Sequence, residues 1–316
     1  MAYALDGELT SLFSMIPEGT TLDYRTARQG AAEMVSLLPQ YDPPHPLDIR
    51  DVMVPGPDGA PEVPVRLYVP SAADSPLPAL VYIHGGGFFM GSRDMDDGHA
   101  SRIAAEVGAV VVSVEYRLAP EHPFPAGLED CYAALAWVAK SASELGIDPD
   151  RLAVGGESAG GGLAAACALL ARDRGGPALC FQYLEYPEID DRLATASMLA
   201  YEDTPLWNKP AAEISWDYYL GAGKRGTADV SPYAAPARAE DLSGLPPAFV
   251  SACQFDPLRD EDIAYAQRLA QANVPTELVL YPGTVHGSKL VREAAISRRM
   301  NADVIAALRR GLHSRG

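Results

Sequence analysis

A glycine-rich turn between an apolar run and a helix-like stretch constrains the fold of this chain more than any other segment. The sequence Gly155-Gly-Glu-Ser-Ala-Gly-Gly161 follows the strand-like residues 151–154 and precedes residues 163–172, which have helical periodicity. Residues 156–160 match G-x-S-x-G, in which small neighbours allow a strained backbone that lifts one serine hydroxyl clear of a sheet. An ordinary glycine-rich turn would carry the same letters. Ser158 is therefore a candidate nucleophile that needs support from the rest of the chain.

Length and composition are typical of one globular domain with a large core, and we expect a single domain over residues 1–316. Apolar residues make up 48% and charged residues 21% of the chain. The net charge of −17 argues against nucleic acid or an anionic membrane as a partner, because binding phosphate requires a high density of lysine and arginine. The N-terminal residues show no signal-peptide pattern, and no run of eighteen apolar residues occurs. We therefore expect a cytoplasmic protein.

The cysteine pattern does not suggest disulfides or a metal site. The four cysteines, at positions 131, 167, 180 and 253, lie within apolar segments and predict reduced core residues. The chain contains no C-x-x-C, no H-E-x-x-H and no G-x-x-x-x-G-K-[ST] motif. We expect no metal and no cofactor.

Strand-like and helix-like segments alternate along most of the chain. Apolar runs typical of strands occur at 80–83, 110–114, 151–154, 180–184, 248–251 and 277–280, and helical segments between or after them at 97–107, 127–145, 163–172, 262–272 and 288–312. The nearly all-valine run at 110–114 indicates a strand buried on both faces of a parallel sheet. Shorter alternating runs at 48–54 and 63–69 indicate two antiparallel edge strands. The alternation predicts an α/β fold with a mostly parallel central sheet and helices on both faces.

Two segments fall outside this alternation. Residues 1–45 predict one or two short helices, and residues 190–231 are rich in aromatic side chains. We predict that the two segments together form a helical cap over the strand ends. The helical spacing in the first segment is carried by Leu9, Leu12, Phe13 and Ile16, and the aromatic residues of the second are Trp207, Trp216, Tyr218 and Tyr219. These aromatic rings could line a pocket, but a cap needs a small core of its own, and we favour that role.

A serine nucleophile requires a base, and His286 lies where the base is expected. In the architecture predicted here, the three catalytic residues follow in the order serine, acid, histidine, each on a loop after a strand. Only His286 and His313 come after Ser158. His313 lies in a basic helical tail, whereas His286 follows the last strand. We therefore expect His286 to be the base.

The acid should lie at the end of the preceding strand, and Asp256 follows the apolar residues 248–251. Three further carboxylates, Asp260, Glu261 and Asp262, come directly after it. They fall where the next helix begins, and acidic residues in a first helical turn are explained by capping and the helix dipole. Asp256 is therefore the expected acid.

His84-Gly-Gly-Gly87 follows the apolar residues 80–83 and is a candidate oxyanion loop. Glycines let backbone N–H groups point at a substrate oxygen without a Cβ in the way. We expect Gly85, Gly86 and Ala159, the residue after the nucleophile, to supply the donors. His84 is expected to position the loop by a hydrogen bond.

These motifs together resemble the hormone-sensitive-lipase-like esterases, the bacterial family IV of the α/β-hydrolase superfamily. The resemblance rests on His84-Gly-Gly-Gly87, Tyr116-Arg-Leu-Ala-Pro-Glu121, Gly156-Glu-Ser-Ala-Gly-Gly161, Asp256-Pro-Leu-Arg-Asp-Glu261 and His286-Gly287, and runs from about residue 50 to the C-terminus. Residues 181–191 and 203–207, with Ser-Lys-Leu after Gly287, look most similar to the heroin-esterase type of acetyl esterase. Glu157 stands where the family usually has Asp, and Ser288 where it has Phe. These departures predict a pocket beside the base that is more open or more polar than usual.

The resemblance implies a cofactor-free carboxylesterase that hydrolyses short acyl esters through Ser158, His286 and Asp256. The expected partner is a small-molecule ester, with no nucleic acid and no membrane, and a homodimer is possible, since the sequence does not determine the oligomeric state. Two alternatives stay open at this point. The same triad could hydrolyse amides or carbonates, because fold and triad are shared across acyl-transfer chemistries. The second alternative is a small-molecule receptor without catalytic activity, like the plant gibberellin receptors of this family.

Overall fold

The computed structural model describes residues 3–11, 23–35, 41–71 and 76–313. The strands are β1 (Leu47–Val54), β2 (Val63–Pro70), β3 (Leu77–Ile83), β4 (Val110–Val114), β5 (Ile147–Glu157), β6 (Phe181–Glu185), β7 (Ala248–Cys253) and β8 (Thr276–Tyr281). The helices are α2 (Tyr24–Val35), α3 (Asp97–Ile103), α4 (Ala126–Lys140), α5 (Ala159–Asp173), α6 (Ala196–Ala200), α7 (Lys209–Leu220), α8 (Arg259–Gln271) and α9 (Ala295–His313). Short helical turns are η1 (Gly7–Leu9), η2 (Ala104–Gly108), η3 (Pro236–Arg238) and η4 (Ser288–Leu290).

All eight strands form one sheet in the order β1-β2-β4-β3-β5-β6-β7-β8. Strand β2 is antiparallel to both β1 and β4, and every other neighbouring pair is parallel. The mostly parallel central sheet is therefore confirmed. The prediction of two edge strands at the N-terminal side was half wrong, because β2 is enclosed between β1 and β4. Strand β8 forms the opposite edge.

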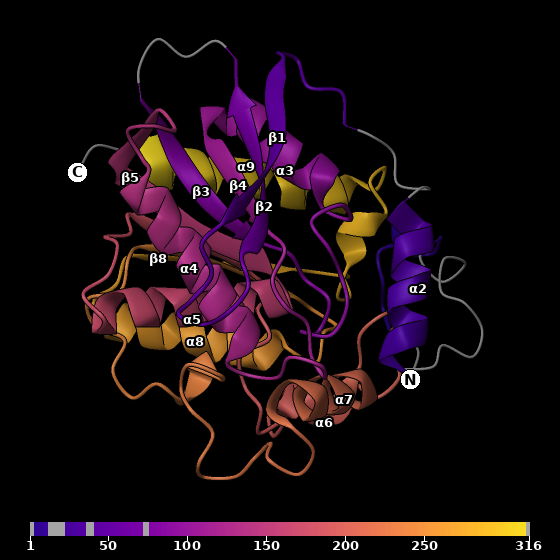
Figure 1. Cartoon of the computed structure of the whole chain (residues 1–316). Coiled ribbons are helices and arrows are strands. Elements are labelled where there is room, and N and C mark those ends of the chain that lie inside the picture. The colour runs from indigo at the N-terminus through magenta and orange to yellow at the C-terminus, as the bar shows by residue number, and fades with distance from the viewer. Residues whose placement is uncertain (1–2, 12–22, 36–40, 72–75, 314–316) are drawn as a thin grey trace.

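Helices cover both faces of the sheet, as Figure 1 shows for α4 in front and α9 behind. Helices α4, α5 and α8 pack on the face with the larger core, and α3, η2 and α9 pack on the other. Strand β4 contributes to both cores: Val110, Val112 and Val114 face the first and Val111 the second. This alternation follows from the two-residue period of a strand. Valine at every one of these positions therefore fills two apolar layers at once.

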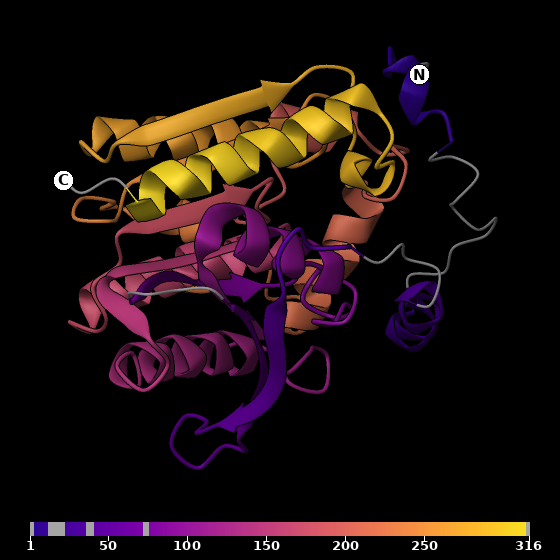
Figure 2. The same ribbon diagram turned by 90° about the horizontal axis from the view of Figure 1, so that it is seen from above.

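The elements α2, α6 and α7 lie beyond one end of the sheet, on the side toward which β8 points in Figure 2. Helices α2 and α7 touch through the rings of Tyr24 and Tyr218, whose centroids are 5.6 Å apart in an edge-on arrangement. Tyr219 of α7 stacks on Phe88 at 4.0 Å, and Trp216 is fully buried beside them. These aromatic side chains form a local core, as expected. That residues 1–45 and 190–231 act as a cap stays a prediction.

Several element boundaries differ from those expected. Helix α4 ends at Lys140, about a turn earlier than predicted, and the last helix starts only at Ala295, because η4 and a turn come first. The predicted helix at 97–107 changes to a π-helical turn over Ala104–Gly108. Leu9 lies buried in η1, whereas Leu12, Phe13 and Ile16 lie outside the described residues. All four cysteines are free thiols, three of them buried and Cys180 half-buried.

Candidate active site

Ser158 lies in a strained turn between β5 and α5. Its φ of 54° and ψ of −125° belong to a region that residues with a side chain rarely adopt. The surrounding backbone holds this conformation. The Ser158 N–H donates to the carbonyl of Glu185 at 2.9 Å, and the Ser158 carbonyl accepts from the N–H groups of Gly162 and Glu188, both at 3.0 Å.

The glycines on either side of Ser158 are required by the close approach of β3. A Cβ on Gly160 would lie 2.0 Å from the carbonyl oxygen of Ile83 and 2.5 Å from that of His84. A Cβ on Gly156 would lie 2.3 Å from the same Ile83 oxygen. Real Cβ atoms essentially never come that close, so packing against β3 requires glycine at both positions, in addition to the needs of the turn.

Three predicted side chains meet beside this turn. The Nε2 atom of His286 lies 2.9 Å from the Oγ atom of Ser158, and its Nδ1 atom lies 2.7 Å from the Oδ2 atom of Asp256. Ser158 and His286 are 6% and 8% exposed, and Asp256 is fully buried. A hydroxyl, an imidazole and a carboxylate in hydrogen-bonded series can activate the hydroxyl as a nucleophile.

Asp256 differs from the neighbouring carboxylates in what it contacts. Its Oδ1 atom accepts the backbone N–H of Leu258 at 3.0 Å, which fixes the carboxylate while Oδ2 faces His286. Asp260 bonds to Ser197 and Arg259, and Glu261 accepts backbone N–H groups at 2.9 and 3.1 Å. Asp262 is buried, and neither of its oxygens has a hydrogen-bond partner among the described residues. Only Asp256 of these four reaches the imidazole within the described part of the chain.

Aromatic rings enclose the imidazole of His286. The Tyr186 ring packs edge-on against it with centroids 4.7 Å apart, and the Trp207 ring lies at 5.8 Å. Trp207 is 4% exposed and also fills the space beside Gly87, where its ring edge would lie 2.6 Å from an added Cβ. Trp207 therefore belongs both to the aromatic core and to the surroundings of the base.

The glycine loop after β3 lies directly against Ser158. A Cβ on Gly85 would lie 3.4 Å from the Cβ of Ser158, and the φ values of Gly86 and Gly87 are 119° and 56°. Among the described residues, no hydrogen bond uses the backbone N–H of Gly85 or Gly86. Those of Ala159 and Gly160 lie in the first turn of α5, where helical N–H groups have no intrahelical partner. The loop and the helix N-terminus therefore offer unused donors beside the serine.

His84 holds this loop in place, as expected. Its Nδ1 atom lies 2.8 Å from the carbonyl oxygen of Gly85, and its ring stacks on Tyr116 with centroids 4.3 Å apart. The Tyr116 hydroxyl in turn donates to the carbonyl of His84 at 3.1 Å. Burial lowers the pKa of His84, so the ring stays neutral near pH 7.

Sequence reasoning did not find a buried charged network behind the serine and the histidine. The Lys289 ammonium lies 2.9 Å from Glu157 and 2.6 Å from Glu185, and the Tyr186 hydroxyl donates to Glu157 at 3.0 Å. Burial by itself raises the pKa of Glu157, but Lys289 more than offsets it and lowers the value to about 2. Burial also raises the pKa of Glu185, and Lys289 opposes this shift. The one sequence signal for this network is a lysine three residues after His286, the expected base.

Ser288 and Glu157, the two residues that depart from the family pattern, both bond to other groups of the protein. The Ser288 hydroxyl is buried, accepts the N–H of Val285 at 2.9 Å and donates to its carbonyl at 2.8 Å. Glu157 is held by Lys289 and Tyr186. Neither polar group is therefore free to make the pocket beside the base more polar.

A second buried carboxyl group, Glu188, lies close to the serine and was also missed. Its backbone N–H donates to Ser158, and its side chain is fully buried with no hydrogen-bond partner for either oxygen among the described residues. Burial raises the pKa of Glu188 to about 8, and the nearby negative charge of Asp256 adds to the shift. Glu188 is therefore largely protonated at pH 7.

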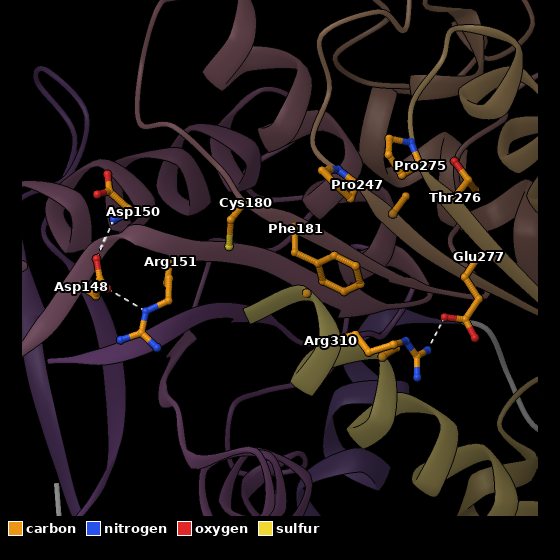
Figure 3. A pocket seen from close by; sticks show the side chains of 13 residues that line it. Asp148, Asp150, Arg151, Cys180, Phe181, Pro247, Pro275, Thr276, Glu277 and Arg310 are labelled. Atoms are coloured by element: carbon orange, nitrogen blue, oxygen red, sulfur yellow. Dashed lines mark hydrogen bonds and ion pairs between the residues drawn. The ribbon is translucent and has the colours of Figure 1, made fainter. Parts of the chain in front are cut away.

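A surface hollow of about 890 Å³ lies at the end of the sheet where strands β5 to β8 begin, opposite the end that carries Ser158 (Figure 3). It is bordered by the first residues of β5 to β8 and by the end of α9, whereas Ser158 follows the last residue of β5. Its two arginines are paired: Arg151 with Asp148 at 2.7 Å, and Arg310 with Glu277. The hollow is therefore separate from the triad.

Two further searches of the described residues gave negative results. No group of three or more His, Cys, Asp or Glu side chains in that part of the chain is arranged to hold a metal ion. None of the helices described is long and apolar enough to span a bilayer.

Comparison with known proteins places this site in a family. A family model described as the alpha/beta hydrolase fold matches residues 80–290. This range contains every residue of the triad and of the glycine loop. The chain belongs to the α/β-hydrolase family. Its resemblance to the hormone-sensitive-lipase-like esterases is confirmed by this match and by the relatives described next.

Three similar proteins have names that denote esterases. Carboxylesterase NlhH of Mycobacterium tuberculosis is 44% identical over 264 residues, which cover 82% of each chain. Esterase LipI of the same species is 38% identical, with 90% of this chain and 88% of the relative covered. A solved structure named bacterial heroin esterase is 49% identical, with a TM-score of 0.93 and coverage of 98% of this chain and 99% of the other.

Proposed function

We propose that this chain is a carboxylesterase that hydrolyses short-chain, acetyl-type esters with Ser158, His286 and Asp256 as its catalytic residues. The observation that carries the proposal is the continuous hydrogen-bonded series from the Ser158 hydroxyl through His286 to the buried Asp256. The names of the similar proteins support ester hydrolysis as the reaction. Because all three catalytic side chains are present and in contact, the geometry does not favour a receptor without catalysis.

The reaction follows from the positions of these atoms. The Ser158 oxygen attacks the ester carbonyl carbon while His286 Nε2 takes the hydroxyl proton, and Asp256 stabilises the imidazolium through Nδ1–H. The tetrahedral intermediate expels the alcohol, which receives the proton from Nε2, and an acyl-enzyme remains. Water then attacks the acyl carbon, with His286 again accepting a proton and returning it to Ser158. The products are the carboxylic acid and the free enzyme.

The negative oxygen of each tetrahedral intermediate needs donors that are already in place. The N–H groups of Gly85, Gly86 and Ala159 are the proposed oxyanion hole. They lie on the loop and the helix turn that border Ser158, and removing one such donor typically costs on the order of 3 kcal/mol of transition-state stabilisation.

The enclosure of the triad supports a preference for short acyl groups. Ser158 and His286 are almost inaccessible, and Trp207 packs against both His286 and the glycine loop. Phe88, at the end of that loop, is stacked on Tyr219. A long acyl chain would have to displace buried aromatic rings. We propose that residues 1–45 and 190–231 form the cap that supplies this wall. The cytoplasmic location expected from the sequence stays a prediction, and the homodimer stays a possibility that the sequence left open.

The first test is chemical. Wild-type protein should turn over an acetyl ester and gain one adduct mass at Ser158 with a serine-directed organophosphate, whereas Ser158→Ala should do neither. Retained turnover in the Ser158→Ala variant would refute the assignment of Ser158 as the nucleophile.

A second measurement tests the substrate range. Rates with p-nitrophenyl esters from acetate to octanoate should fall steeply beyond about butyrate, because longer chains meet the aromatic wall. A matched p-nitroanilide series separates ester from amide hydrolysis. Octanoate as the preferred substrate would contradict the short-chain proposal and leave ester hydrolysis standing.

A further inference from the structure

The buried network around Lys289 joins the two segments that carry the reacting atoms. Glu157 directly precedes Ser158, and the backbone carbonyl of Glu185 accepts the Ser158 N–H at 2.9 Å. Lys289 lies three residues after His286 and contacts both carboxylates, at 2.9 and 2.6 Å. One ammonium group therefore connects the ends of β5 and β6 with the loop that carries the base.

Tyr186 connects the same network to the imidazole. Its hydroxyl donates to the Glu157 oxygen that Lys289 also contacts, and the Lys289 Nζ atom lies 5.8 Å from the centroid of its ring. The edge of that ring packs on His286 at 4.7 Å. A change at Lys289 would therefore reach His286 both along the chain and through Tyr186.

The network is not a favourable source of stability in itself. The side chains of Lys289 and Glu185 are 10% and 1% exposed, and removing such groups from water usually offsets most of the attraction between them. Apolar residues at these positions would often be as stable. A buried cation that contacts no reacting atom but connects both catalytic segments is better explained by the geometry it imposes.

We propose that Lys289 is a positioning residue that sets the distance between His286 and Ser158, an inference that rests on the proposed function. Through Glu157 and Glu185 it fixes the turn of the nucleophile, and through its own loop it fixes the base. Misplacement of reacting groups by about 1 Å can lower turnover about 100-fold, so the proposal places the cost in kcat and leaves KM nearly unchanged.

The test compares steady-state kinetics and organophosphate labelling rates in four variants. In K289M we expect kcat and the labelling rate at Ser158 to fall about 10- to 100-fold, with KM within about 3-fold of wild type. In K289R, which keeps the positive charge, we expect kcat and the labelling rate to return to near the wild-type values.

The third variant guards against misfolding. K289M leaves the half-buried Glu157 and the buried Glu185 without their cation and can fail to fold, so K289M/E157Q also removes the charge of Glu157. We expect it to fold with a melting temperature near that of wild type and still to show the low kcat. A folded K289M/E157Q variant with kcat within about 2-fold of wild type would overturn the proposal.

The fourth variant, R238M, controls for the loss of any buried ion pair. Arg238 pairs with the fully buried Asp191 at 2.5 and 2.9 Å, and no contact of either residue with the triad occurs among the described residues. R238M should lower the melting temperature while kcat stays within about 2-fold of wild type. An equal loss of kcat in R238M and K289M would count against a specific role of Lys289. Wild-type protein that neither hydrolyses acetyl esters nor reacts with the organophosphate would refute the proposed function itself.

Discussion

Asp256 is the residue whose role can be separated most sharply from that of its neighbours. Its Oδ2 atom faces the Nδ1–H of His286, and its Oδ1 atom is held by a backbone N–H. Asp256→Asn presents an amide N–H to Nδ1 and so favours the wrong tautomer of the imidazole. We expect kcat to fall about 10³- to 10⁴-fold with a small change in KM, measured on an acetyl ester.

Asp262 provides the matched control for this substitution. It is buried on α8, where burial raises its pKa above the usual range of a carboxyl group. Asp262→Asn makes the same substitution at a carboxyl group that has no hydrogen bond to His286 or to any other described residue. Its kcat should equal that of wild type within about 2-fold, and a loss as large as that of Asp256→Asn would reopen the assignment of the acid.

Glu188 predicts a pH dependence of stability. Its pKa is about 8 in the folded protein against 4.5 for an exposed glutamate, so the folded state keeps a proton that the unfolded chain releases. Its contribution to the free energy of unfolding is therefore complete below about pH 4.5 and is lost as the pH rises toward about 8. Glu188→Gln cannot ionise. We expect it to be more stable than wild type at pH 8, by on the order of 3 kcal/mol, and similar to it at pH 4.5.

Urea unfolding at several pH values between 4.5 and 8.5 measures this difference. The curve of stability against pH should be flatter for Glu188→Gln than for wild type. Parallel curves for the two proteins would show that Glu188 does not keep its proton on folding.

At the scale of the elements, one arginine of α2 supplies its hydrogen bonds to the loops beside the site, in addition to the ring contact of Tyr24 with Tyr218. The Arg28 guanidinium donates to the carbonyls of Phe89 and Ala119, both at 2.7 Å, and to both oxygens of Glu121 at 2.9 and 2.8 Å. Phe89 lies two residues after the glycine loop. Arg28→Ala should therefore release α2, raise KM for short esters several-fold and speed proteolysis of the N-terminal segment.

Arg25→Ala is the control for the release of α2. Arg25 lies on the same helix and is exposed, and its guanidinium lies over the ring of Tyr24 without a hydrogen bond to any other described residue. KM and the rate of proteolysis should stay at the wild-type values. Unchanged kinetics in Arg28→Ala would contradict the view that the N-terminal segment belongs to the cap.

The sequence was sufficient for elements whose local pattern allows one solution. The valine run of β4 must be buried on both sides, and the glycines around Ser158 match the close approach of Ile83. The order of Ser158, Asp256 and His286 along the chain could be read because each follows a strand. The ion pairs of Lys289 with Glu157 and Glu185 could not be predicted from the sequence. They join the ends of three segments and therefore depend on strand order and register. The end of α4 and the start of α9 were missed because turns occupy the adjoining residues 141–146 and 291–294, which the helical periodicity does not distinguish from a helix.

At the scale of the whole molecule, the surplus of negative charge opposes compaction. The chain has 42 acidic and 25 basic residues. Many acidic groups are paired, as Arg66 is with Asp51 and Asp94 at 2.7 and 2.8 Å, but such half-exposed pairs contribute only about 0 to 1 kcal/mol each. The unpaired surplus acts over longer distances. At 10 mM salt the screening length is about 30 Å, comparable to the size of the domain, so like charges across the whole surface repel one another.

Salt should therefore stabilise this protein. Repulsion between the negative charges favours unfolding, because unfolding separates them. Added salt screens this repulsion and so stabilises the folded state. The short ion pairs are screened less. We expect the thermal midpoint to rise by a few degrees between 10 and 150 mM NaCl and to change little beyond, with the same result in KCl. At pH 5, where part of the carboxylates are protonated and the net negative charge is smaller, the rise should be smaller. A midpoint that falls on addition of NaCl would show that the surface ion pairs, and not the net charge, dominate the electrostatics of the folded state.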